Sequence, residues 1–224
     1  MLEILRNPVR DYRKLRPENL STDTYIHLKL LAFWPVFGWL FWFAEQVIPL
    51  EACHAVHCSL DDQIPFLEVF VIPYVFWYVY LVGMHVYTLL YDVEAFRQMM
   101  KFIIITYTVT LAIYFLFPNC QNLRPDVFER QTALTEIVAD IYAADTNTNV
   151  CPSLHVVGSL AVCFTSWHCR RPHGFPGKIW TVGLTLCAML ISASTVFMKQ
   201  HSVIDVAAAV ALCAPVYWYC FVRE

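Results

Sequence analysis

Six long apolar stretches constrain this chain more than any other feature of its sequence. Lipid offers the backbone no hydrogen-bond partner, so a spanning segment must be helical and needs about 20 mostly apolar residues. The six stretches lie near residues 28–49, 65–90, 101–118, 153–169, 178–198 and 202–222. Pro35 and Pro73 fall within the first two and are expected to kink them. The sequence therefore predicts an all-α, polytopic bundle of six transmembrane helices.

Composition supports an integral membrane protein and argues against a nucleic-acid partner. Of the 224 residues, 58% are hydrophobic and 15% are charged, whereas a soluble domain carries about 25% charged residues. The net charge is −3, and no Lys/Arg-rich tract has interleaved aromatic residues. No repeat or linker interrupts the apolar region. We expect a cytoplasmic basic tail over residues 1–27 and a single transmembrane domain over residues 28–224.

Loop charges predict the orientation of the bundle. Cytoplasmic loops carry an excess of Lys and Arg. With the N-terminus in the cytoplasm, most basic residues lie inside: Arg6, Arg10, Arg13, Lys14, Arg16, Lys29, Arg97, Lys101, Arg170, Arg171, Lys178 and Arg223. Only Arg124, Arg130 and Lys199 remain outside. The basic tail then lies along the anionic inner leaflet or is solvated and only sets topology.

Three polar segments stand out at the ends of apolar stretches. They are "FPNCQNLRPD", which contains Arg124, "CPSLH", which contains Ser153 and His155, and "STVFMKQHSVIDV", which contains Lys199, His201 and Asp205. In the predicted topology all three lie at the extracytoplasmic face. Ionisable groups at membrane depth are expensive and suggest function.

The residue types in these segments suit phosphoryl transfer. His201 and Asp205 are spaced i,i+4, so they are expected on one face of the last helix, where Asp205 fixes the tautomer of a nucleophilic His201. His155 can protonate a leaving alkoxide. The helix N-terminus near Ser153, with Arg124 and Lys199, favours a phosphate. No metal or other cofactor is required.

These residues resemble the three signature segments of the type 2 phosphatidic acid phosphatase superfamily. The family patterns are K-x6-R-P, P-S-G-H and S-R-x5-H-x3-D, in this order on a six-helix membrane fold. The resemblance covers roughly residues 100–215. It implies that His201 becomes phosphorylated, that Asp205 orients it, and that His155 is the acid/base. It also implies that Ser153 and Arg124 hold the phosphate, and Ser194 matches the serine that opens the third pattern.

Three positions depart from the family patterns. Phe117 stands in place of the lysine, Thr195 in place of the arginine, and Leu154 in place of the glycine. Lys199 is able to supply one of the two missing charges. The "PSLH" and Lys-Gln-His forms look more like the branch that includes relatives of inositol phosphorylceramide synthase. A site with fewer cations favours a phosphodiester over a doubly charged monoester.

The leading expectation is an enzyme that hydrolyses a lipid phosphate at the outer leaflet. The alternatives are transfer of a lipid headgroup to a second lipid alcohol, as in a phosphosphingolipid synthase, and a non-catalytic relative that keeps the bundle. Simpler interpretations also exist. His155 and His201 are then interfacial histidines that hydrogen-bond within the bundle, Arg124 is a snorkelling side chain and Asp205 is the structural partner of a buried polar group.

Other polar and aromatic residues have ordinary interpretations. "CHAVHC", residues 53–58, does not match a standard zinc spacing; a Cys53–Cys58 disulfide is favoured there, and Cys120 and Cys151 form a second candidate pair. Asp145 and Asn149 either line the entrance of the site or belong to a solvated loop. The tryptophans at positions 34, 39, 42 and 77 are expected to face lipid or the interface.

Overall fold

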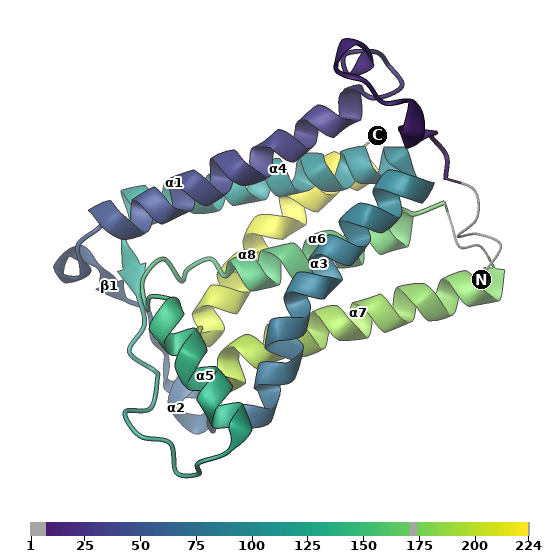
Figure 1. Cartoon of the computed structure of the whole chain (residues 1–224). Coiled ribbons are helices and arrows are strands. Elements are labelled where there is room, and N and C mark those ends of the chain that lie inside the picture. The colour runs from purple at the N-terminus through teal and green to yellow at the C-terminus, as the bar shows by residue number, and fades with distance from the viewer. Residues whose placement is uncertain (1–7, 171–173, 224) are drawn as a thin grey trace.

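The computed structural model describes residues 8–170 and 174–223, so Arg6 and Arg171 lie outside the described residues. Of the described residues, 73% are helical (Figure 1). The α-helices are α1 (Phe33–Val47), α2 (Ser59–Gln63), α3 (Val71–Tyr91), α4 (Val93–Leu116), α5 (Ala133–Ala144), α6 (Leu154–His168), α7 (Gly174–Phe197) and α8 (Val203–Tyr217). The 3-10 turns are Tyr12–Lys14, Pro17–Asn19, Ile26–Ala32, Leu50–Ala52 and Glu68–Phe70, and a π-helical turn, Trp218–Val222, follows α8. Two short strands, β1 (His54–Ala55) and β2 (Asn119–Cys120), pair in parallel.

Five helical segments of the described chain are long and apolar enough to cross a membrane. They are Ile26–Val47, Glu68–Tyr91, Val93–Leu116, Gly174–Phe197 and Val203–Val222. The predicted all-α polytopic fold is therefore confirmed. The remaining predicted span corresponds to α6, which has 15 residues and a length of about 22 Å, short of the roughly 30 Å hydrocarbon core.

The short α6 helix lies at the centre of the bundle and packs against α3, α4, α7 and α8. Nine of its 15 residues are buried, so much of its surface contacts its helical neighbours and not lipid. Gly158 allows this close packing. A Cβ atom at this position would lie 2.8 Å from Tyr107 Oη and 2.9 Å from Trp77 Cζ2.

Pro35 and Pro73, which the sequence analysis expects to kink their helices, lie in the first turn, where proline does not distort an α-helix. Pro35 and Pro73 are each the third residue of an α-helix, and in the first turn a missing N–H interrupts no hydrogen bond of that α-helix. The described helices do contain an interior proline, Pro215 in α8, and the π-helical turn follows it.

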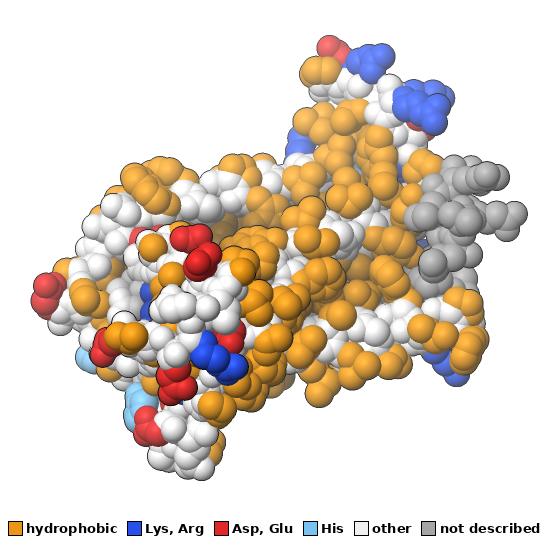
Figure 2. Space-filling view, turned by 60° about the horizontal axis from the view of Figure 1, so that its bottom comes forward, with side chains coloured by type: hydrophobic (Ala, Val, Ile, Leu, Met, Phe, Trp, Pro, Cys, Tyr) orange, Lys and Arg blue, Asp and Glu red, His pale blue; other side chains and the backbone are white. Residues whose placement is uncertain are grey.

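The two ends of the bundle differ in charge. The described N-terminal segment and the C-terminal end of α8 lie at one end, whereas α2, α5 and the β1–β2 pair lie at the other (Figure 1). Figure 2 shows hydrophobic side chains over the middle, acidic side chains gathered at the end that carries α5, and Lys and Arg groups at the opposite end, with a further basic group beside the acidic ones. An apolar middle between two charged ends is the arrangement expected of a helical bundle that spans a membrane.

The N-terminal tail packs on the bundle in its described part. Val9 N donates to Leu90 O at 2.8 Å, and Tyr12 Oη donates to Leu89 O at 2.7 Å. Tyr12 also hydrogen-bonds the buried His27 ring at 2.9 Å. The division of the chain at residue 27 stays a prediction.

The β1–β2 ladder joins the loops at the acidic end of the bundle. His54 pairs with Asn119 and Ala55 with Cys120, and Cys120 also forms a bridge with Thr148. All nine cysteines are free thiols, so neither of the two expected disulfides is present. Burial and the neighbouring Cys120 instead raise the pKa of the Cys53 thiol.

We expect Gly158→Ala to loosen the contact of α6 with α3 and α4. Its midpoint of thermal unfolding in detergent should lie below that of Gly83→Ala, by the equivalent of roughly 1–3 kcal/mol, because overpacking a tight contact displaces its neighbours. Gly83 on α3 has no atom within 4 Å of a built Cβ, so it controls for the change in helix propensity. Equal midpoints for the two variants would contradict the close packing.

Candidate active site

The N-terminus of α8 holds a histidine–aspartate pair. His201 Nδ1 lies 3.1 Å from Asp205 Oδ2, and the same oxygen accepts a hydrogen bond from Ser202 N at 2.9 Å. His201 precedes the helix, Ser202 is its N-cap and Asp205 closes the capping box, so the pair does not lie along one helical face as the spacing suggested. The carboxylate thus caps the helix and orients the imidazole at once.

The second histidine lies directly opposite. His155, in the first turn of α6, has its ring centroid 6.1 Å from that of His201. The ring of Tyr74 stacks on it with centroids 4.3 Å apart, and Trp77 lies at 4.5 Å. Backbone contact joins the two helix starts, because Ser153 N donates to Asp205 O at 3.3 Å. Two segments separated by 46 positions therefore present their rings to one space.

A buried aspartate that the sequence analysis did not single out supports this arrangement. Asp61 in α2 accepts hydrogen bonds from Ser202 Oγ at 2.7 Å, Val203 N at 2.8 Å and Cys58 N at 2.8 Å. Burial alone would raise the pKa of Asp61, but these hydrogen bonds hold it below its usual value. Lys199 Nζ donates to the Asp61 carbonyl at 2.6 Å. Asp61 therefore fixes the segment that carries His201.

Several buried polar atoms around the histidine pair have no hydrogen-bond partner. They are His155 Nε2, Ser153 Oγ, Gln200 Nε2, Asn149 Nδ2 and Oδ1, Arg124 Nε and Asp205 Oδ1. Most of these atoms are donors or, like the hydroxyl, able to donate. An unmade hydrogen bond at a buried polar group costs about 1–3 kcal/mol, so such a cluster indicates a place prepared for a ligand with acceptor oxygens.

Arg124 lies behind this space and holds the loop that lines it. Its Nη1 donates to the carbonyl oxygens of Tyr142 and Asp145 at 3.1 and 3.0 Å. Its Nη2 donates to Thr146 O at 2.9 Å and to Gln200 Oε1 at 2.6 Å. Burial lowers the pKa of Arg124, and the Asp145 carboxylate opposes this. The guanidinium thus orders the Tyr142–Thr146 backbone, with Nε left unpartnered.

The other predicted phosphate-binding residues are placed differently. Ser153 is fully buried as the N-cap of α6. Ser194 Oγ donates within α7 to Ile191 O at 2.6 Å, and Lys199 is engaged by Asp61. Among the described residues that line the cavity, His155 and His201 are the two that sequence analysis assigned to the site. Phosphate-binding roles for Ser194 and Lys199 stay predictions.

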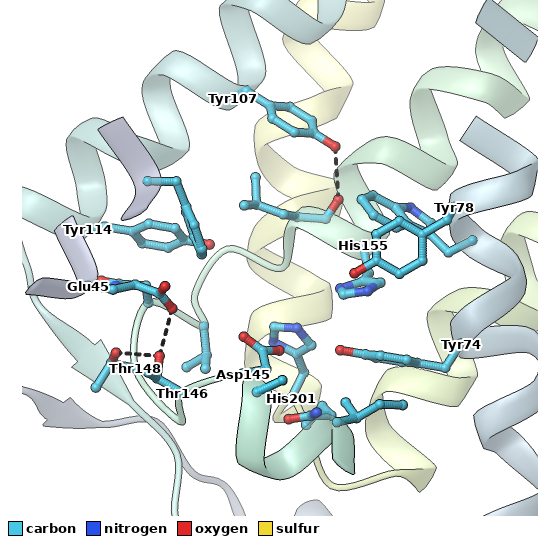
Figure 3. Close-up of a pocket in the computed structure, with 18 of the residues that line it drawn as sticks. Glu45, Tyr74, Tyr78, Tyr107, Tyr114, Asp145, Thr146, Thr148, His155 and His201 are labelled. Carbon is cyan, nitrogen blue, oxygen red and sulfur yellow. Dashed lines mark hydrogen bonds between the residues drawn. The ribbon is translucent and has the colours of Figure 1, made fainter. Parts of the chain in front are cut away.

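The cavity beside the histidines has a volume of about 450 Å³, within the range of small-molecule sites. Figure 3 shows Tyr74, Tyr78, Asp145, His155 and His201 directed into one space. Asp145 and Asn149 line it, so the interpretation that places them at the site holds. Trp34 and Trp77 also line it, which corrects the expectation that these tryptophans face lipid or the interface. Trp39 and Trp42 are more than half exposed, as expected of lipid-facing side chains.

The positions that depart from the family patterns have other contacts. Phe117 stacks on His54 with ring centroids 4.5 Å apart. Thr195 supplies its carbonyl oxygen to the N–H groups of Gln200 and His201. Within the described chain, no group of three or more His, Cys, Asp or Glu residues is placed to hold a metal ion.

We expect Asp61→Asn to lower both stability and the function of His201. The amide cannot accept all three hydrogen bonds, and loss of buried acceptors costs about 1–3 kcal/mol each. Asp61→Asn should unfold at a lower temperature than the wild-type protein. Its turnover should fall at least tenfold, with a larger effect on kcat than on KM. Asp62→Asn, next in sequence and bonded only to the exposed His57, is the matched control. If both variants behaved alike, the positioning role of Asp61 would be wrong.

Comparison with known proteins supports the resemblance that the polar segments suggested. Residues 99–223, more than half of the chain, match the PAP2 superfamily, and this range contains all three segments. No curated protein and no solved structure matches the chain. The protein belongs to the type 2 phosphatidic acid phosphatase (PAP2) superfamily.

Proposed function

We propose that this integral membrane protein is a phosphoric ester hydrolase that cleaves a lipid phosphate through a phosphohistidine intermediate. One observation carries the proposal. His201, oriented by Asp205, faces His155 with the two ring centroids 6.1 Å apart, both rings line one cavity, and His155 Nε2 has no hydrogen-bond partner. At this spacing one ring can reach a phosphorus atom while the other reaches an ester oxygen of the same phosphate.

The chemistry follows from the hydrogen bond to Asp205. Because the Nδ1–H group of His201 donates a hydrogen bond to the Asp205 carboxylate, the neutral ring keeps a lone pair on Nε2. Nε2 attacks phosphorus, so an N–P bond forms while the P–O bond to the lipid alcohol breaks, and protonated His155 gives its proton to the leaving oxygen. Water then attacks phosphorus and gives a proton to His155. The N–P bond breaks, and phosphate leaves.

The unpartnered donors supply the phosphate cradle in this proposal. Asn149 Nδ2 and Gln200 Nε2 belong to residues that line the cavity, and both are neutral donors able to meet acceptor oxygens, whereas no lysine or arginine of the described chain lines it. The N-termini of α6 and α8 also favour negative charge there. Their combined effect replaces part of the charge that Phe117 and Thr195 do not provide.

A second candidate function is transfer of the phosphoryl group to a lipid alcohol in place of water. The observation that favours it is the absence of Lys and Arg from the described cavity lining, which suits a singly charged diester better than a dianionic monoester. Incubation with a phosphodiester lipid labelled at phosphorus, with and without ceramide, separates the two: a water-soluble labelled headgroup phosphate supports hydrolysis, and a labelled phosphodiester of ceramide supports transfer.

The proposed orientation places the site outside the cytoplasm and both ends of the described chain inside. It is supported by the starts of α6 and α8, which carry the histidine pair and lie toward the end of the bundle opposite to the described N-terminal segment (Figure 1). Figure 2 shows Lys and Arg groups at the end with that segment, as expected of a cytoplasmic end.

His201→Ala should abolish turnover, and His155→Ala should reduce hydrolysis of phosphatidic acid by roughly 10²–10⁴-fold because the alkoxide then leaves unprotonated. The loss in His155→Ala should be much smaller with p-nitrophenyl phosphate, whose leaving group needs no proton. Rapid quenching of wild-type protein with labelled substrate should trap an acid-labile phosphoprotein that His201→Ala lacks.

His57→Gln is the control for these variants, since His57 lies at the same end of the bundle and its side chain is 47% exposed. It should retain wild-type turnover. Wild-type protein without activity on any lipid phosphate would instead support the non-catalytic relative.

Sidedness is tested in whole cells that express the protein. Cells with intact membranes should hydrolyse an added short-chain lipid phosphate, because the proposed site opens outward, and permeabilisation should raise the rate little. Activity seen only after permeabilisation would reverse the orientation. Cells that express His201→Ala give the background.

A further inference from the structure

The cavity carries negative charge on a side that the proposed chemistry leaves unused. Glu45 in α1 and Asp145 after α5 both line it, and no lysine or arginine does so among the described residues. Glu45 Oε1 accepts a hydrogen bond from Thr146 Oγ1 at 2.8 Å (Figure 3). Carboxylates facing the place of a phosphate repel it, unless they serve a positive group that arrives with it.

Asp145 lies near the histidine pair and is largely withdrawn from water. Burial raises the pKa of its carboxyl group, while the charges of His201 and Arg124 act in the opposite direction. Arg124 Nη1 donates its hydrogen bond to the backbone carbonyl oxygen of Asp145 and not to the side chain, so the carboxylate itself is left for another partner. A cation bound beside it would remove the cost of keeping the group ionised.

Aromatic rings form most of the remaining wall. Eight of the residues that line the cavity are Phe, Tyr or Trp, among them Tyr74, Trp77 and Tyr78 beside the histidines. Ring faces attract cations, most strongly quaternary ammonium groups that hold no tightly bound water. A wall made for acyl chains alone would contain neither the two carboxylates nor so many rings with polar tips.

We propose that this acidic and aromatic wall is a subsite for an alkylammonium headgroup, so that the substrate is a zwitterionic phosphodiester lipid with a choline-like head. The proposal rests on the function proposed above and names its substrate class. Phosphate lies between His155 and His201, and the ammonium group lies toward Asp145, Glu45 and the aromatic rings. The bond that breaks is still the P–O bond to the lipid alcohol, so the headgroup phosphate is released to water or passed to a second alcohol.

The decisive probe differs from the substrate in one atom. Release of diacylglycerol is measured in mixed micelles for phosphatidylcholine and for its neutral isostere, in which carbon replaces the quaternary nitrogen. The two heads have the same size and differ in charge. The wild-type protein should have a kcat/KM at least tenfold higher for phosphatidylcholine. Equal values for the two lipids would overturn the proposal.

Two carboxylate variants locate the effect. Asp145→Asn and Glu45→Gln should each reduce the preference for phosphatidylcholine over the isostere several-fold, and should raise kcat/KM for phosphatidic acid because a like charge facing the phosphate is gone. Asp140→Asn is the matched control, because this α5 carboxylate is exposed and does not line the cavity. An equal loss with all three lipids in the cavity variants would show a structural role and contradict the subsite.

The aromatic contribution is tested at Tyr78, which lines the cavity and is 58% exposed, so replacement leaves the packing of the bundle largely intact. Tyr78→Phe keeps a ring face and should keep the preference for the charged head, whereas Tyr78→Leu should lower it. If Tyr78→Leu kept the same preference for phosphatidylcholine as Tyr78→Phe, attraction between the ring face and the ammonium group would play no part.

Failure of this inference is distinguishable from failure of the proposed function. Phosphatidic acid that is hydrolysed with full dependence on His201, together with no preference between phosphatidylcholine and its isostere, rejects the headgroup subsite alone. Turnover that survives His201→Ala rejects the phosphohistidine mechanism, whatever the headgroup preference.

Discussion

The hydrogen-bonding of two buried carboxylates at the start of α8 underlies the rest of the site. Asp205 accepts from His201 and Ser202, and Asp61 accepts from Ser202 and Val203. In a low-dielectric interior each carboxylate is tolerable only with several donors. The segment between α7 and α8 therefore has one satisfactory arrangement, which leaves the second nitrogen of His201 facing the cavity.

The sequence predicted much of this architecture because two of its signals are strong. Long apolar runs identify membrane helices, because a run of this length satisfies its own backbone hydrogen bonds in lipid only as a helix. The three polar segments fall where such runs end. The His201–Asp205 contact was also predictable from spacing. The residue at which α8 begins was not predictable. The same i,i+4 separation fits two residues on one helix face, and it also fits a histidine that lies two residues before the helix with an aspartate that caps it.

What the sequence did not predict depends on side-chain direction and on distant contacts. Trp34 and Trp77 have the surroundings of lipid-facing aromatics in sequence, yet they line the cavity, because the face of an all-apolar helix cannot be chosen from periodicity alone. Asp61 lies in a short polar segment far from the motifs, and its partners Ser202 and Val203 are about 140 positions away. The burial of α6 depends on its packing against α3, α4, α7 and α8, which no local pattern reports.

Eight of the 21 residues that line the cavity come from α1 and α3, whose other faces expose large apolar side chains such as Trp39, Trp42 and Val79. For a substrate whose acyl chains stay in the bilayer, such a cavity is reached by lateral diffusion in two dimensions. The mole fraction of substrate in the membrane, and not its amount per volume of water, then sets the rate of encounter. Dilution with inert lipid slows such an enzyme even when its total substrate is unchanged.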